Sequence, residues 1–450
     1  MTSSFSVGLD IGTTSISAAI ISHDKHTTID SYTVPYRFNI TATDPDLSEQ
    51  DAVLIRNTVM ELIYEIYKKH ENISSIGVTG QMHGVLLIDK NGNAVTNLIN
   101  WQDRRGERKT SDGITYCQRI TEITGESVPT GYGFASLYYN YQNGIIPDTA
   151  HSFCSIMDFV VMGLTGNCEP VIHSSVAKSF GLFDDVSCSF MDKNIEKLEI
   201  NIAKLPETTD DYKICGNYNG IPVSVAIGDN QASFLGSVKN IENSILLNIG
   251  TGSQISAVTD SHTHSDELEI RPLVKDKYIK CGSALCGGSA YALLEKFFAE
   301  YARAAGFGDD SQYDIINKLA YDAYENNKAL TVNTCFKGKR SDPSLTGSVM
   351  GITVDNFTPG ALSLGFLRGI CMELYTMFKD NIGDKTTVVA SGNAVQKIKI
   401  LRDIISDIFS LPVSICSTTE EASVGAALFS AVAAGIISDV HEFSNYINYN

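Results

Sequence analysis

Several features that mark particular classes of protein are missing from this sequence. Its ten cysteines stand singly without a CxxC pair, which gives no zinc or disulfide framework and fits reduced thiols in a cytosol. No run of about 18 apolar residues occurs, so we expect no membrane span. The N-terminus has no basic stretch followed by an apolar one, so we expect no secretory signal and a cytoplasmic protein.

Basic residues are scarce. The chain has 34 Lys and Arg against 52 Asp and Glu, a net charge of −18. Such a chain binds nucleic acid or an anionic membrane poorly, which favours a small-molecule partner. Any phosphate site must therefore depend on backbone amides, a few basic side chains and a divalent cation. The length of 450 residues, 43% of them hydrophobic, predicts two packed domains.

Two glycine turns, one in each half of the chain, resemble each other. Residues 5–20 read FSVGLDIGTTSISAAI and residues 245–258 read ILLNIGTGSQISAV. Each pattern predicts a β-hairpin whose turn brings backbone amides close to a ligand. Hydroxyl donors flank the two turns: Thr13, Thr14, Thr251 and Ser253. Because aligned amides suit phosphate oxygens, Gly12 and Gly250 predict a duplicated ATPase core that holds a triphosphate from both sides.

The rest of the chain reads as alternating strands and helices. Residues 46–70 have helical spacing, whereas residues 100–180 show no long regular period and predict an insertion that builds a substrate wall. The domain break is expected near 238–244. A helix over 420–434 should close the second domain, and the polar residues 441–450 should fray.

Two aspartates follow predicted strands. Asp10 precedes the first glycine turn, where its carboxylate can hold Mg²⁺, usually through water; the alternative is that it only caps the turn. Asp229, in Gly-Asp-Asn-Gln, can accept a proton from a hydroxyl that attacks phosphorus; the alternative is an N-cap of a helix from Ala232. Together with two phosphate turns, the catalytic interpretation is favoured.

A second polar group suits a sugar. Gln81 and His83 stand between glycines after a buried strand, although a lone histidine is more often structural. Trp101, the only tryptophan, lies beside amides and the Asp103 carboxylate, and an aromatic ring with such neighbours suits the apolar face and the hydroxyls of a sugar. A core role for Trp101 is the alternative. The loop 391–394 is expected to meet adenine or ribose.

Seven motifs in this order resemble the FGGY carbohydrate kinases over almost the whole chain. The motifs are Asp-Ile-Gly-Thr-Thr-Ser (10–15), Gly-Gln-Met-His-Gly (80–84), Trp-x-Asp-x-Arg (101–105), Gly-Asp-x-Gln-Ala (228–232), Gly-Thr-Gly-Ser (250–253), Ser-Gly-Asn-Ala (391–394) and Glu-Ala-Ser-Val-Gly-Ala-Ala (421–427). The resemblance implies an α/β fold of two ribonuclease-H-like, actin-like ATPase domains with a cleft between them. It implies a sugar-binding domain over 1–240, a nucleotide-binding domain over 241–450, and ATP and Mg²⁺ as cofactors.

The resemblance also implies roles for single residues. Substrate contacts are expected from Gln81, Met82, His83, Trp101, Asp103, Asp229 and Asn230, with Asp229 as catalytic base and Asp10 at the metal. Nucleotide contacts are expected from Thr13, Thr14, Ser15, Gly250, Thr251, Gly288, Gly392 and Asn393. The usual Gly-Glu-Arg of the family reads Gly338-Lys339-Arg340 here, which puts any inherited role of position 339 in doubt.

The sugar and the class of ATPase have alternatives. Residues 130–136 and 157–161 look like the sedoheptulokinase branch, which implies phosphorylation of sedoheptulose to its 7-phosphate, with xylulose as the next candidate. Kinases of this type are often homodimers. A rival hypothesis is an actin- or chaperone-type ATPase that drives partner binding. That rival leaves the polar set of Gln81, Trp101 and Asp229 without a purpose.

Overall fold

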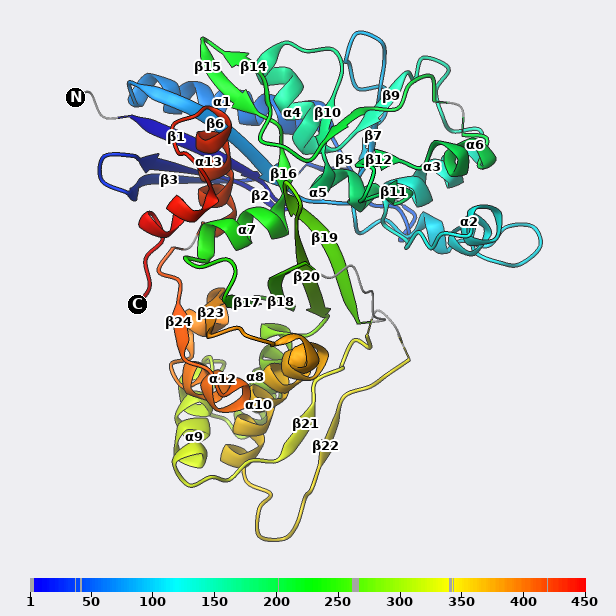
Figure 1. Cartoon of the computed structure of the whole chain (residues 1–450). Coiled ribbons are helices and arrows are strands. Elements are labelled where there is room, and N and C mark those ends of the chain that lie inside the picture. The colour runs from blue at the N-terminus through cyan, green and yellow to red at the C-terminus, as the bar shows by residue number, and fades with distance from the viewer. Residues whose placement is uncertain are drawn as a thin grey trace. The chain divides into compact units, whose positions relative to one another are not determined.

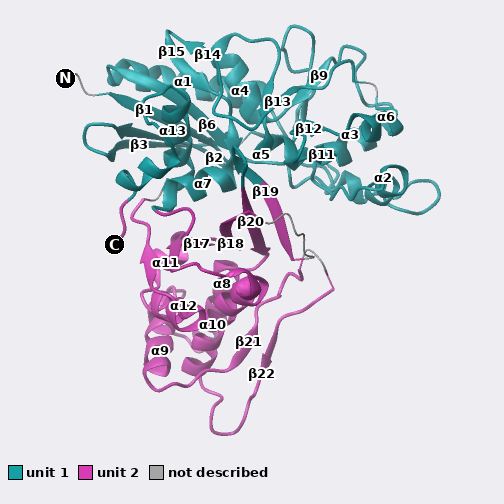
Figure 2. Ribbon diagram, viewed as in Figure 1, with its two compact units in different colours: residues 1–239, 272–277, 420–447 teal, residues 240–271, 278–419, 448–450 magenta. Residues whose placement is uncertain are grey.

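The computed structural model describes residues 4–36, 38–40, 43–200, 202–260, 267–339, 342, 344–418 and 420–450. The chain divides into two compact units (Figure 2). Unit 1 contains Met1–Lys239, Pro272–Lys277 and Glu420–Ile447, and unit 2 contains Asn240–Arg271, Tyr278–Thr419 and Asn448–Asn450. The change near residue 240 falls where the sequence places its domain break, while two later segments return to unit 1.

Unit 1 is built on a mixed sheet (Figure 1). Strands β1 and β2 form the predicted hairpin, and β6 runs parallel to β1 on its other side. In order across the sheet the strands are β14 (Ile214–Tyr218), β15 (Ile221–Ser224), β6 (Ile73–Gly80), β1 (Phe5–Ile11), β2 (Ser15–Ser22) and β3 (Thr27–Pro35), with β16 (Ile227–Gly228) also paired to β6.

Helices cover both faces of this sheet. Gly8 of β1 faces α13 (Glu421–Ala433) so closely that a Cβ would lie 1.8 Å from the Ser423 carbonyl oxygen. Neighbouring strand residues point to the opposite face, where Val7 and Leu9 join a core with α1 (Ala52–Lys69) and α4 (Ile156–Thr165). Helix α13 also packs on α7 (Asp229–Ser237). The expectation that it closes the second domain is therefore wrong.

Helix α1 is shorter than predicted. Asp51 caps it by accepting a hydrogen bond from the Leu54 amide at 2.9 Å, and Lys68 and Lys69 occupy its last turn. The preceding residues form β5 (Glu49–Gln50), the middle strand of a small sheet between β4 (Asn39–Ile40) and β8 (Leu98–Ile99). This two-residue strand places polar side chains near the first glycine turn.

The region 100–180 is more regular than expected. It forms α2 (Tyr116–Thr124), α3 (Gly133–Gln142), α4 and α5 (Ser174–Ala177). Helices α2 and α4 each begin with a capping box and end at a left-handed glycine, whereas no side chain caps the start of α3. Short strands complete unit 1: β7 (Leu86–Ile88) pairs with β9 (Ser152–Cys154), β10 (Val171–His173) with β13 (Glu207–Thr209), and β11 (Phe183–Asp184) with β12 (Ser189–Phe190). Helix α6 spans Asp192–Lys197.

The predicted frayed tail is ordered. Phe443 is fully buried, and the Tyr446 hydroxyl lies 2.9 Å from His23 Nδ1. Aromatic side chains in this polar-looking segment supply the burial that holds it on unit 1 as far as Ile447.

Unit 2 repeats the hairpin arrangement. Strands β17 and β18 are antiparallel, and β17 is parallel to β23. The sheet order is β19 (Leu268–Val274), β20 (Lys277–Ala284), β18 (Ser253–Thr259), β17 (Ser244–Ile249), β23 (Thr387–Ser391) and β24 (Val413–Ile415). The helices are α8 (Gly288–Ala304), α9 (Tyr313–Glu325), α10 (Pro359–Phe378), α11 (Asn393–Lys397) and α12 (Leu401–Phe409), and β21 (Thr331–Asn333) pairs with β22 (Ser348–Met350).

Helix α10 forms the centre of the unit 2 core. Leu364, Leu367 and Leu374 are fully buried on it. Its length and composition would also suit a membrane span, but most of it is buried inside the structure. The helix is thus accounted for as a core element.

Candidate active site

Three predicted polar loops of unit 1 begin at the same edge of its sheet. Strands β1, β6 and β16 are mutually parallel, and the register places Ile11 beside Gly80 and Gly80 beside Gly228. Their carboxyl ends therefore coincide, which brings together the Asp10 turn, the loop from Gln81 and the start of α7 at Asp229. Ligands of α/β sheets bind at such ends.

Asp229 is the first residue of α7, not the cap of a helix from Ala232. Gly228 occupies the cap position, and no side chain caps this helix. The Met82 thioether packs against the same turn, because a Cβ on Gly228 would lie 2.7 Å from its sulfur. The loop after β6 and the start of α7 are thus in direct contact.

The Asp10 carboxylate is half-buried and accepts no hydrogen bond from the residues that the structure describes. It therefore does not cap the turn. Burial, together with the nearby charges of Asp229 and Glu420, raises the pKa of Asp10 from 3.8 to about 7. Three carboxylates thus concentrate negative charge at the carboxyl end of β1. No group of three acidic, His or Cys side chains converges on one metal position among the described residues.

A chain of hydrogen bonds joins the loop after β6 to the first glycine turn. Gln81 Nε2 donates to Gln50 Oε1 at 2.8 Å, and Gln50 Nε2 donates to the Thr13 carbonyl oxygen at 3.0 Å. Trp101 Nε1 donates to Thr13 Oγ1 at 3.0 Å. Gln50 is completely buried, so it fixes the spacing of the loop and the turn. The Gln81 Oε1 atom is buried without a hydrogen-bond partner.

His83 has a constrained backbone and a fixed ring. Its φ of 70° lies in the left-handed region, which costs on the order of 1 kcal/mol for a residue with a side chain. Its amide donates to Ser179 Oγ at 3.1 Å, and Nδ1 lies 3.1 Å from the Ser179 carbonyl oxygen, so Nδ1 carries a proton. The Tyr132 ring lies 4.3 Å away between centroids. These contacts orient the ring.

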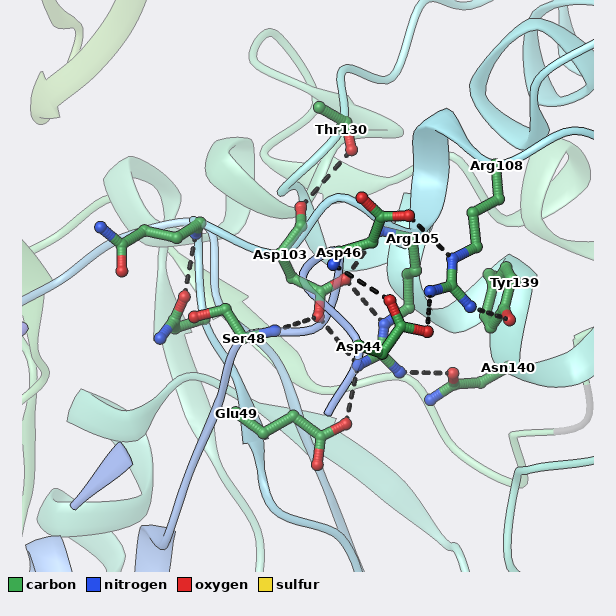
Figure 3. Close-up of polar contacts among 12 residues, drawn as sticks. Asp44, Asp46, Ser48, Glu49, Asp103, Arg105, Arg108, Thr130, Tyr139 and Asn140 are labelled. Carbon is green, nitrogen blue, oxygen red and sulfur yellow. Dashed lines mark hydrogen bonds and ion pairs between the residues drawn. The ribbon is translucent and has the colours of Figure 1, made fainter. Parts of the chain in front are cut away.

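Asp103 is the centre of a buried ion network (Figure 3). Its carboxylate accepts hydrogen bonds from the Ser48 amide at 2.9 Å and from the Arg105 amide at 3.0 Å, and Arg105 Nε lies 2.7 Å from it. Arg105 in turn reaches Glu49 at 2.7 Å and Asn140 at 2.7 Å. In this structure Asp103 orders the segment beside Trp101, and a substrate contact by Asp103 stays a prediction.

In unit 2 the second glycine turn packs against the start of α8. The Gly288 amide donates to the Gly250 carbonyl oxygen at 2.7 Å, and the Ser289 amide donates to the Thr251 carbonyl oxygen at 3.0 Å. Gly392, which caps α11 at φ 94°, also approaches β17: a Cβ there would lie 2.7 Å from the Ile249 carbonyl oxygen. The predicted nucleotide residues of this half, including Asn393 at the start of α11, therefore gather at one end of the unit 2 sheet.

Serine hydroxyls around this turn lack partners. Ser253, Ser289 and Ser391 have buried Oγ atoms without a hydrogen-bond partner in the described residues. Such groups fit a site that takes up polar atoms.

Other predicted residues lie as follows. In unit 1, Thr14 is exposed, Ser15 opens β2 and Asn230 is buried on α7. Lys339 forms an ion pair with Glu267 at 2.6 Å, and Arg340 lies outside the described residues. Sequence reasoning missed Gln50, because Glu49 and Gln50 read as part of a helix start. The only signal was two polar residues just before the Asp51 cap.

The fold and the site together define a phosphotransferase class: twin hairpin-based ATPase domains with a carboxylate cluster and a polar, aromatic set at the strand ends of one of them. Residues 5–236 match the N-terminal domain of the FGGY family of carbohydrate kinases, and residues 246–434 match its C-terminal domain. The chain belongs to this family and is a carbohydrate kinase.

Several curated relatives and solved structures are similar along nearly their whole length. Sedoheptulokinase of Mus musculus is 24% identical over 94% of this chain and 96% of its own length. Gluconokinase of Bacillus subtilis (strain 168) is also 24% identical, over 99% of this chain and 90% of its own length. A gluconate kinase structure from Lactobacillus acidophilus has a TM-score of 0.83 at 20% identity, covering 100% of this chain and 93% of that one. This structural likeness shows the fold: two actin-like ATPase domains.

Proposed function

We propose that this kinase transfers the γ-phosphoryl group of ATP to the terminal hydroxyl of a ketose, and that the ketose is sedoheptulose. The observation that carries the sugar assignment is the position of the loop 130–136, whose sequence is of the sedoheptulokinase type. Its Tyr132 ring lies against the His83 ring at a tilt of 33°, and Gly131 lies against the Trp101 backbone, where a Cβ would be 2.3 Å from the carbonyl oxygen. The loop therefore lies between two predicted sugar contacts.

The residues at the end of β1 fit a divalent cation. Because Asp10 lies near the negative charges of Asp229 and Glu420, its carboxylate ionises less readily, and a bound cation would relieve this repulsion. When bound, Mg²⁺ would supply neutralisation of the β- and γ-phosphates. Asp10 would hold it, directly or through water.

Asp229 is proposed as the catalytic base. Its carboxylate accepts the proton of the sugar hydroxyl while that oxygen forms a bond to the γ-phosphorus and the bond to the bridging oxygen breaks, so that ADP leaves. Gln81 and His83 orient the sugar, and Gln50 keeps them in register with Thr13 of the phosphate turn. Because phosphoryl transfer has a loose transition state, positioning contributes most of the acceleration.

We assign the sugar to residues 1–240 and the nucleotide chiefly to residues 241–450. The buried, unpartnered hydroxyls of Ser253, Ser289 and Ser391 around the Gly250 turn support a polar ligand there. The ten cysteines are all free, which supports action in the cytoplasm.

A kinase assay with a panel of sugars tests the assignment. ADP release would be measured with sedoheptulose, xylulose, gluconate and glycerol, and without any acceptor. We expect the highest kcat/KM with sedoheptulose; a higher value with another acceptor would replace the sugar but keep the kinase. Sugar-independent turnover would favour the actin- or chaperone-type ATPase.

The role of Asp229 is tested with Asp229→Asn beside Asp148→Asn, which removes an exposed carboxylate elsewhere in unit 1. We expect Asp229→Asn to reduce kcat by a factor on the order of 10² or more while nucleotide binding stays near normal. Asp148→Asn should leave kcat unchanged. Undiminished sugar phosphorylation by Asp229→Asn would remove it from the role of base.

A further inference from the structure

A hollow in unit 1 uses none of the residues assigned to sugar, nucleotide or metal. Its volume is about 390 Å³, and it is formed by α1, the turn after β7 and the end of α4. Arg56 and Asn57 come from α1, Asn91 from the turn, and Asn167 and Cys168 from the segment after α4. Small-molecule sites have volumes of this order, about 300–1,000 Å³.

Among the residues that the structure describes, Arg56 is the only charged one that lines the hollow. Its side chain is half-buried, and its guanidinium carbon lies 4.4 Å above the Phe159 ring centroid. Helix α4 passes so close that a Cβ on Gly163 would lie 2.7 Å from Arg56 Cδ. The side chain is therefore held by packing on α4. No described carboxylate forms an ion pair with Arg56, and no described residue accepts its hydrogen bonds.

The lining contrasts with the rest of the chain. The protein carries 52 acidic residues, yet none of the Asp and Glu residues that the structure describes lines this hollow. The nearby Asp89 carboxylate is turned to its own loop, where it accepts from the Asn91 and Asn93 amides at 2.8 Å each. What surrounds Arg56 instead are side-chain amides, which can donate to and accept from hydroxyl groups.

We propose that this hollow binds a small polyhydroxylated anion, a sugar phosphate or a sugar acid. The phosphate or carboxylate lies on the Arg56 fork, whose planar N–H groups match two oxygens of such a group. The hydroxyls lie on the side-chain amides of Asn57 and Asn91 and on Asn167 Oδ1, since Asn167 Nδ2 already donates to the Cys215 carbonyl oxygen at 2.7 Å. An anion is favoured because Arg56 brings a positive charge to the hollow and no described carboxylate pairs with it. The hollow is separate from the proposed sugar site. Binding of an anion there therefore does not depend on which acceptor the kinase assay identifies.

Cys168 provides a local reporter, because it is the one exposed cysteine of the ten and lines the hollow. The full-length protein would be treated with a maleimide, and labelling of Cys168 followed by peptide mass spectrometry. Ribose 5-phosphate, gluconate, inorganic phosphate and ribose would be the probes. We expect ribose 5-phosphate or gluconate to slow labelling about tenfold at ten times its Kd. The more effective of the two anions identifies the phosphate or the carboxylate class.

Variants separate this site from other effects. Arg56→Gln should abolish the protection, and Arg56→Lys should retain part of it because the charge stays while the fork is lost. The matched control is Lys90→Gln, which removes an exposed charge next to Asn91 that does not line the hollow. It should keep full protection. Absence of protection by both sugar anions, equal protection in Arg56→Gln, or equal protection by ribose or by inorganic phosphate would overturn the proposal.

Discussion

Removing the Asp10 charge should stabilise the metal-free protein while it disables the enzyme. The pKa of Asp10 rises from 3.8 to about 7 because burial, Asp229 and Glu420 all disfavour the ionised carboxylate. A shift of about three pKa units corresponds to about 4 kcal/mol, an upper bound. Since Asp10 is only half-buried, we expect Asp10→Asn to gain about 2–4 kcal/mol of unfolding free energy near pH 8.

The direction of the pH dependence follows from the raised pKa. Below about pH 3, Asp10 is mostly neutral in both the folded and the unfolded chain, and the substitution changes little. As pH rises toward 7, the Asp10 carboxyl loses its proton in the unfolded chain but keeps it in the folded protein. The wild type therefore loses stability relative to the variant. The advantage of Asp10→Asn should therefore grow by about 2 kcal/mol between about pH 5 and pH 8.

Urea unfolding measured by tryptophan fluorescence is suited to this test. Trp101 is the only tryptophan and lies in unit 1, so its signal reports the unit that contains Asp10. With EDTA present, the variant should unfold at higher urea near pH 8; added Mg²⁺ should stabilise the wild type only. Asp148→Asn is the control for loss of one charge. An advantage that is absent near pH 8, or equal at both pH values, would refute the reasoning.

Two further predictions concern packing and positioning. Gln50→Ala should lower kcat/KM for the sugar about tenfold or more, because it leaves the buried Gln81 amide without its partner. Gln50→Glu keeps an acceptor for Gln81 but, when ionised, cannot donate to the Thr13 carbonyl oxygen, so it should lower kcat more than it raises KM in steady-state kinetics. If both variants leave kcat and KM unchanged and lower only the stability, Gln50 has a purely structural role. Gly425→Ala should destabilise unit 1 by about 3 kcal/mol, because its Cβ would lie 1.8 Å from the Ala232 carbonyl oxygen on α7; unchanged Trp101-detected unfolding would contradict this close contact.

The loops that carry the proposed chemistry were accessible from the sequence because their signals are local. A β-hairpin with a glycine turn, or a buried strand followed by a polar glycine loop, can be predicted from a short run of consecutive residues. Parallel pairing of β1, β6 and β16 then brings Asp10, Gln81 and Asp229 to one edge of the sheet. The twin hairpins and the α/β class follow from the same local patterns.

Features that depend on distant contacts were not predictable in this way. The two-residue strand β5 leaves no periodic pattern, so the link from Gln50 to Thr13 could not be read from its neighbours. The unit on which α13 packs could not be predicted either, because a stripe of small residues indicates close packing but does not indicate which element it packs against. Asp103 was missed as a network centre since its partner Ser48 is far from it in sequence.

The return of α13 to unit 1 has a consequence for synthesis in the cell. The face of the first sheet that contains Gly8 receives this helix only after residue 420 has been translated. At ribosomal speeds of about 5–20 residues per second, the nascent chain waits on the order of 20–80 s before that helix emerges. During that interval a part-finished sheet with uncovered apolar surface is a natural client for chaperones, even though its own sequence was among the first to be made.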